Sequence, residues 1–207
     1  MKYLICLLAM VSAGTTSLAA TITDTRFNFT LVISDRYRQF PGAADSLYYF
    51  ATSDPANGVP DATIAIQRLH GTIGKEHLDL SATGLPGAQL LTGQWKSFTV
   101  DVFAAQVDAT GTKMAIRGAQ LPLAHEAVQI IVAVPLAREA SAEGILNEFL
   151  TGFDGPSNWS TPKPITPKKR GELIGEGIGR MLLTIAMLIL GVGALIRFIR
   201  RRAATGK

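Results

Sequence analysis

Hydrophobic residues in the central part of the chain recur with a period of two, and this alternation is the feature that most constrains the fold. Between residues 27 and 33, Phe, Phe, Leu and Ile alternate with residues of which most are polar. Successive side chains of a β-strand point to opposite faces, so the pattern predicts a strand with one buried face. Similar runs separated by Gly-, Pro- and Asp-rich turns cover residues 47–52, 62–67, 77–82, 95–104, 112–117 and 127–134. Short strands spaced in this way predict a mainly β, antiparallel sandwich over residues 20–135.

Two short passages support the prediction of a sandwich. Gly58-Val59-Pro60-Asp61-Ala62 leads into the run at 62–67, and Gly93-Gln94-Trp95 leads into the run that contains Phe98. These passages resemble the turn-and-strand signatures of bacterial immunoglobulin-like and transthyretin-like sandwich domains. The resemblance implies an immunoglobulin-like antiparallel sandwich and carries over no catalytic residues. The Cys-Trp-Cys core of antibody domains is absent from the sequence.

A helical pattern follows the predicted strands. In the segment 136–153, Ile145, Leu146, Phe149 and Leu150 recur at the spacing of one helix face. This amphipathic helix either packs on the edge of the sandwich or docks a partner near a membrane. The prolines between residues 156 and 167 cannot sustain a helix, so residues 154–172 are predicted to form a stiff, extended stalk.

Both ends of the chain carry targeting patterns. Lys2, an apolar run and then small residues form a signal-peptide pattern over residues 1–19, with cleavage before Ala20; an uncleaved N-terminal anchor is the alternative. Near the other end, residues 181–196 hold no charge and a single hydroxyl group. With flanking apolar residues, this run predicts a transmembrane helix over residues 173–199. A buried core helix is the alternative interpretation.

Basic residues set the predicted orientation in the membrane. Arg180 and Arg197 bracket the apolar run, and Arg200, Arg201 and Arg202 lie in the tail 200–207. The positive-inside rule places the tail in the cytoplasm and these arginines at the membrane interface. We therefore expect a single-pass type I protein whose N-terminal domain is periplasmic or extracellular.

The net charge of +4 hides an uneven distribution of charged residues. Residues 20–162 carry nine basic and fourteen acidic side chains, whereas residues 163–207 carry ten basic and two acidic ones. Nucleic-acid binding needs basic residues spread over a domain surface, so the acidic domain argues against a nucleic-acid partner. The single cysteine, Cys6, lies inside the predicted signal peptide. The mature chain would therefore have no disulfide and no thiol nucleophile.

Candidate site residues are few. His70 and His77 flank a Gly-rich turn that could bring them together as metal ligands, with Met114 as a further ligand suited to copper. The competing interpretation is a pair of ordinary exposed histidines. The sequence has no Gly-x-Ser-x-Gly elbow, and its paired carboxylates lie in turns or on outward strand positions. An enzyme is therefore not expected, and no catalytic residue or further cofactor is predicted.

Gly171, Gly175 and Gly179 recur every four residues just before the apolar run. On a helix they would form a smooth stripe, which makes Gly175 and Gly179 candidate helix-contact residues; a flexible hinge is the alternative. Together these patterns predict a membrane-anchored, non-enzymatic binding or assembly subunit of an envelope complex. Its expected partners are membrane lipid and a membrane or envelope protein. The alternative function is periplasmic metal delivery or transport assistance through His70 and His77.

Overall fold

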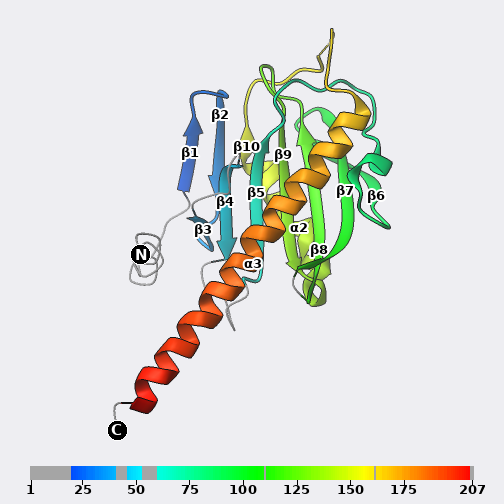
Figure 1. Cartoon of the computed structure of the whole chain (residues 1–207). Helices are drawn as coiled ribbons and strands as arrows, with labels where there is room; N and C mark the ends of the chain where they lie inside the picture. Colours follow the sequence, from blue (N-terminus) through cyan, green and yellow to red (C-terminus); the bar gives the residue numbers. More distant parts are fainter. Residues whose placement is uncertain (1–19, 41–45, 53–59, 110, 161, 206–207) are drawn as a thin grey trace.

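The chain folds around one central β-sheet whose two faces are covered differently. A computed structural model describes residues 20–40, 46–52, 60–109, 111–160 and 162–205; the predicted signal peptide lies outside these residues. Helix α2 and a small second sheet lie against one face of the central sheet. The long helix α3 crosses the other face diagonally, and its C-terminal part extends beyond the sheet (Figure 1).

The central sheet is antiparallel throughout and has the order β3-β4-β5-β9-β8-β7-β6. Its strands are β3 Tyr37–Phe40, β4 Ser46–Thr52, β5 Thr63–Arg68, β6 Gln89–Trp95, β7 Phe98–Ala109, β8 Thr112–Leu121 and β9 Val128–Pro135. The middle strands β5 and β9 are buried almost along their whole length, because both faces of the sheet are covered there. The prediction of a mainly β, antiparallel fold with a short helix is confirmed.

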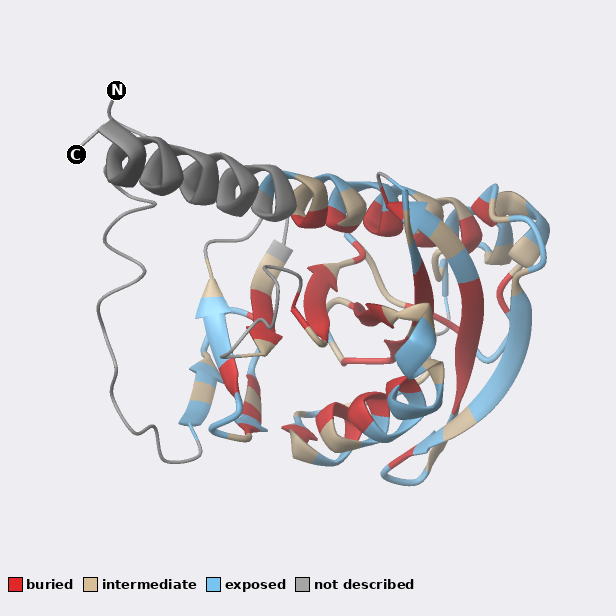
Figure 2. Cartoon of the chain, turned by 90° about the horizontal axis from the view of Figure 1, so that it is seen from below, coloured by how far each residue is buried: buried red, intermediate tan, exposed pale blue. Residues whose placement is uncertain are grey.

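One face of the central sheet carries the larger hydrophobic core. It is covered by α2 (Glu139–Gly152) and by the small sheet β1-β2-β10, which consists of β1 Ala20–Asp24, β2 Phe29–Ile33 and β10 Phe153–Asp154. The buried side of α2 comprises Ala142, Ile145, Leu146, Phe149 and Leu150. Figure 2 shows this buried side turned toward the sheet. The predicted amphipathic helix is thus confirmed, and it packs within its own domain.

The opposite face of the sheet is covered by α3 (Pro167–Thr205), a single helix of 39 residues. Ile174, Ile178, Met181 and Ile185 are buried in a second core with residues from β4, β5, β7, β8 and β9. The helix therefore begins six residues before the predicted span 173–199, and its first half belongs to the domain. Within the described part of the chain, no helix carries a stretch long and apolar enough to cross a membrane.

Two segments differ from the sequence-based expectation. Residues 77–82, predicted as a strand, overlap the short 3-10 helix η2 (Leu80–Thr83). The Asp79 side chain accepts a hydrogen bond from the Ser81 backbone N–H, and Gly84 ends the helix in the left-handed conformation (φ 68°). These local caps stabilise the turn and override the alternation of apolar residues.

The segment predicted as a stalk lies along the domain before α3 begins. Its backbone N–H groups donate to the loop between β5 and η2 (residues 69–79, the 70s loop) and to the β8–β9 connection. Ile165 N lies 2.8 Å from Thr72 O, and Asn158 N lies 3.1 Å from Pro122 O. The prolines do prevent a helix before Pro167, but the extended chain pairs with neighbouring backbone. Over residues 154–160 and 162–166, the chain thus follows the surface of the domain and does not form a free stalk.

The structure does not confirm the finer, immunoglobulin-like assignment. An immunoglobulin-like domain packs two comparable sheets face to face. Here the second sheet has three strands, one of which is two residues long, and a helix occupies the opposite face of the main sheet. Of the motif residues, Gly58 and Val59 lie outside the described residues, whereas Trp95 ends β6 rather than beginning a strand.

Candidate functional site

Three buried glutamines form a strip of amide groups on the sheet face that α3 covers. Gln67 on β5 and Gln120 on β8 are both register partners of Gln129 on β9, so the three side chains lie in one row across the sheet. Gln129 Nε2 donates to Gln67 Oε1 at 2.7 Å, and Gln120 Nε2 donates to Gln129 Oε1 at 3.3 Å. We call this row the glutamine ladder.

The glutamine ladder binds the backbone of α3. Gln67 Nε2 donates to the Gly177 carbonyl at 3.3 Å, and Gln129 Nε2 donates to the Leu173 carbonyl at 3.2 Å. A Cβ on Gly177 would collide with both amide groups, so a glycine is needed for this close approach. The ladder therefore fixes the position of α3 along the sheet as well as its distance from it.

Arg170, in the first turn of α3, completes this polar contact. Its guanidinium is almost fully buried and donates to Gln120 Oε1 and to Asp101 Oδ2, both at 2.7 Å, and to the Glu76 carbonyl. Burial lowers the pKa of Arg170, and the charge of Asp101 opposes that shift. Asp101 also accepts a hydrogen bond from the Leu78 backbone N–H at 2.9 Å. Both members of the pair thus have several polar partners, as a buried ion pair requires.

His77 is joined to this ion pair from the solvent side. Its Nδ1 lies 2.7 Å from Asp101 Oδ1, and the histidine side chain is 69% exposed. A carboxylate that orients a histidine in this way occurs in catalytic and metal sites. The other oxygen of Asp101, however, is held by Arg170 and by the backbone of Leu78. The local geometry therefore connects the 70s loop to α3.

The glycine stripe of α3 contacts the same domain. A Cβ on Gly171 would collide with the Asp79 carbonyl, and a Cβ on Gly175 would collide with the Thr83 carbonyl. Gly175 is therefore a helix-contact residue, but its contact is η2 of its own chain. A Cβ on Gly179 would meet no described atom within 4 Å, so this glycine faces outward.

The lower half of the contact is apolar and holds one unsatisfied polar group. Met181 and Ile185 are buried in the same core as Tyr49 of β4. The Tyr49 hydroxyl is buried without a hydrogen-bond partner among the described residues, and burial raises the pKa of Tyr49 to about 12. The polar contacts that hold α3 are thus concentrated between Arg170 and Gly177.

The structure separates Met114 from His77, two of the three candidate metal ligands. His70 is exposed and has a left-handed backbone conformation (φ 52°), whereas Met114 is buried in the core beneath α3. His77 contacts Asp101, whose neighbour on β7, Val102, is the register partner of Ala119 on β8. Met114 lies five residues from Ala119 along β8, a separation of ~17 Å at ~3.4 Å per residue. Within the described ranges, no group of three or more His, Cys, Asp or Glu side chains could hold a metal ion.

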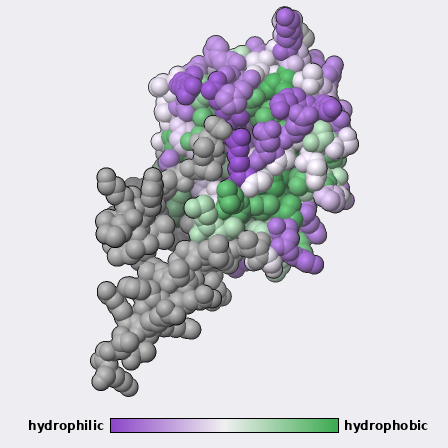
Figure 3. All heavy atoms as spheres, in the orientation of Figure 1, coloured by the Kyte–Doolittle hydropathy of each residue, from purple (hydrophilic) through white to green (hydrophobic). Residues whose placement is uncertain are grey.

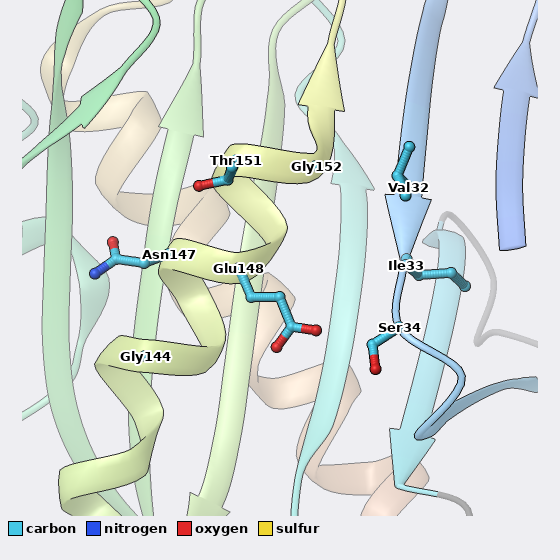
Figure 4. Close-up of a pocket in the computed structure, with 8 residues that line it drawn as sticks. All are labelled: Val32, Ile33, Ser34, Gly144, Asn147, Glu148, Thr151 and Gly152. Carbon is cyan, nitrogen blue, oxygen red and sulfur yellow. The ribbon is translucent and has the colours of Figure 1, made fainter. Parts of the chain in front are cut away.

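Two shallow hollows lie on the other side of the molecule. The first has a volume of about 490 Å³ and lies between β2 and α2; its lining residues are Val32, Ile33, Ser34, Gly144, Asn147, Glu148, Thr151 and Gly152 (Figure 4). The second, of about 540 Å³, lies beside the β1–β2 turn and is lined in part by Lys96 and Asp154. Lys96 forms an ion pair with Asp154 there. Neither hollow brings together a nucleophile, a base and an oxyanion-binding group.

The predicted interface arginines lie on α3. Arg180 is exposed, with a guanidinium nitrogen 3.8 Å from Glu176 Oε2. Arg197, Arg200, Arg201 and Arg202 belong to the helical part of the chain beyond Met187, the last residue of α3 whose side chain the structure describes.

Comparisons with known proteins find distant structural similarity alone. No family model and no curated protein matches the sequence. LpqN of Mycobacterium tuberculosis, which is involved in cell envelope biogenesis, is 13% identical over 66% of this chain and 90% of its own, with a TM-score of 0.47. The Ran-binding protein Mog1p of Saccharomyces cerevisiae is 15% identical over 69% of this chain and 97% of its own, with a TM-score of 0.49.

A protein of Bacteroides thetaiotaomicron is similar to the same extent, with 14% identity over 69% of this chain and a TM-score of 0.49. The matched region spans half of that protein's length. Likeness at this level concerns an antiparallel, β-rich fold, so the function has to be inferred from the residues of this chain.

Sequence reasoning missed the glutamine ladder and the buried ion pair. Gln67 and Gln129 stand among apolar residues in runs that are typical of buried strands, and this was the available signal. A glutamine inside such a strand needs a polar partner that covers the sheet. Arg170 has no comparable signal, because its burial depends on the sheet beneath it.

Proposed function

We propose that this chain is an exported, non-enzymatic accessory subunit that α3 anchors in a membrane. The observation that carries the proposal is the continuity of α3: a helix clamped to the sheet between Arg170 and Ile185 runs on without interruption to Thr205. In such an arrangement the anchor and the domain are one rigid unit.

The sequence beyond the clamp supports insertion into a bilayer. The apolar run 181–196 extends past Met187 and is followed by Arg197 and the basic tail. A charged flank on each side of an apolar helix is typical of a membrane span, and a basic tail is retained in the cytoplasm. Together with the signal-peptide pattern at residues 1–19, a cytoplasmic tail would place the sheet domain on the outer side of the membrane.

A non-enzymatic role agrees with how the polar groups are used. Asp101, Arg170 and the glutamine ladder are hydrogen-bonded to one another, and these bonds hold α3 on the sheet. Residues 20–162 carry the net negative charge of the exported part. We propose that its surface binds a membrane or envelope protein, to which the docked helix presents the domain in a fixed orientation.

Alkaline carbonate extraction of membranes from expressing cells tests the anchor. We expect the wild-type chain in the membrane pellet, and release of a Leu190→Arg/Val192→Arg variant, since each charge near the centre of a span costs about 2.5–3.5 kcal/mol. Leu90→Arg/Leu91→Arg, on the exposed edge strand β6, is the matched control and should stay in the pellet. Release of the wild-type chain by carbonate would refute the proposed anchor.

A further inference from the structure

The exposed residues on the outer face of α3 change from charged to apolar before the inner face of the helix leaves the sheet. Lys169, Glu176 and Arg180 are exposed in the first part of the helix. Farther along, Leu183 is 63% exposed and Met187 is 67% exposed. Ile185, between these two apolar residues, is fully buried against the sheet. One turn of α3 is therefore in contact with the sheet on one side and apolar toward solvent on the other.

The length of the helix beyond the sheet is short for a bilayer. Between Ala186 and Ile199 there are 14 residues, which span ~21 Å at ~1.5 Å per residue. The hydrocarbon core of a bilayer is ~30 Å thick, so about six residues are missing. The residues that could supply the difference are 180–185, of which Met181 and Ile185 are packed against the sheet.

Other apolar residues border the core beneath α3. Val107 on β7 and Leu182 on α3 are partly exposed and pack against the core beneath α3. Figure 3 shows a hydrophobic area on the lower part of this face, beside the point where α3 leaves the sheet; hydrophilic residues gather on the upper part and also border this area at its lower right edge. We call Val107, Leu182, Leu183 and Met187 the rim patch.

We propose that the rim patch is a lipid-binding surface at the boundary between the headgroup layer and the hydrocarbon core of the bilayer that α3 enters. This inference rests on the proposed anchor and adds the position of the domain: the lower end of the sheet rests on the membrane. The missing helix length is then supplied by the turn around Leu183, which is exposed to lipid on its outer side alone. His77 and the first turn of α3, at the other end of the sheet, point away from the membrane.

Single-cysteine labelling tests this position in the full-length chain. A Cys6→Ser background leaves no other cysteine, so a cysteine introduced at Val107 can carry an environment-sensitive fluorophore. Thr99 is the matched control, because it is exposed on the same face of β7 and lies ~27 Å farther along the strand at ~3.4 Å per residue. Leu183 is labelled as the reference for the anchor. The protein is reconstituted in phosphatidylcholine vesicles whose lipids carry a nitroxide near the headgroup.

We expect the nitroxide lipids to quench most of the fluorescence at Val107 and Leu183 and little of it at Thr99. Quenching at Leu183 without quenching at Val107 would overturn the rim patch while leaving the anchor intact, since the helix would then carry the domain clear of the surface or leave the sheet. No quenching at either position, with release of the chain by carbonate, would refute the anchor itself. Melting temperatures within the wild-type range confirm that the labelled variants are folded.

Discussion

Replacing Arg170 by methionine removes the charged member of the α3 contact and keeps most of its aliphatic length. The substitution eliminates the hydrogen bonds to Gln120, Asp101 and the Glu76 carbonyl. Asp101, whose side chain is 7% exposed, then remains in the interior without its cation. Methionine fills irregular apolar space well, so the predicted effect comes from the unpaired charge and not from a cavity.

The size of the effect follows from the burial of both partners. Breaking a buried ion pair by removing one member costs about 3–5 kcal/mol, because the other charge is left without compensation. Asp101 retains hydrogen bonds with Leu78 and His77, which places this case near 3 kcal/mol, the lower end of that range. Adding Asp101→Asn removes the unpaired charge, so the double variant should be more stable than the sum of the single effects by about 0.5–3 kcal/mol.

Urea unfolding of the full-length chain in mild detergent measures this effect through the fluorescence of the buried Trp95. Arg38→Met is the matched control: Arg38 is exposed on β3, and its removal should change the free energy of unfolding by less than about 0.5 kcal/mol. If Arg170→Met costs no more than Arg38→Met, the ion pair does not hold α3 on the sheet and the reasoning is refuted.

Three further predictions concern the α3 contact and the histidines beside it. Gly177→Ala should lower the melting temperature far more than Gly179→Ala in thermal denaturation, since a Cβ at Gly177 meets two amide groups and one at Gly179 meets no described atom within 4 Å. Equal effects would contradict the close approach. Burial raises the pKa of Tyr49 to about 12, so the unfolded chain loses this proton first, and Tyr49 should lower stability between pH 10 and 12 by up to about 1.4 kcal/mol per pH unit. The pKa values of Tyr37 and Tyr48 are also raised to about 12, so Tyr49→Phe should reduce the slope seen in urea titrations at each pH by the share of one tyrosine. Copper or zinc at micromolar concentration should leave the melting temperature unchanged, and an increase that His77→Ala abolishes would restore the metal hypothesis.

The strands that follow a strict alternation were predictable from the sequence. Residues 47–52, 62–67, 112–117 and 127–134 fall within or closely overlap β4, β5, β8 and β9, because the apolar residues on the faces of these strands pack in the two cores. Leu78 and Leu80 also alternate, yet Asp79 and Gly84 supply helix caps that outweigh two apolar residues. Edge strands such as β6 were missed, since a strand exposed on both faces has no apolar periodicity to detect.

The candidate site was less predictable, because it exists only when distant segments meet. In the sequence Gln129 is a single polar residue in an apolar strand, and its hydrogen-bond partner on α3 is evident only in the folded chain. The glycines of α3 indicated a close helix contact, and the structure supplies a partner within the chain for Gly175. Met114 suits a ligand and a core residue equally well, and strand register decides for the core.

The central claim is that α3 remains docked on the sheet while it anchors the chain, and a distance measurement in membranes tests it most directly. Spin labels at Thr99 on β7 and Glu176 on α3, both exposed, report the position of the helix on the sheet by pulsed electron resonance. In vesicles that retain the chain after carbonate treatment, the account predicts one narrow distance distribution, broadened by Arg170→Met. A broad distribution in the wild-type chain would show that the helix leaves the sheet and would contradict the account.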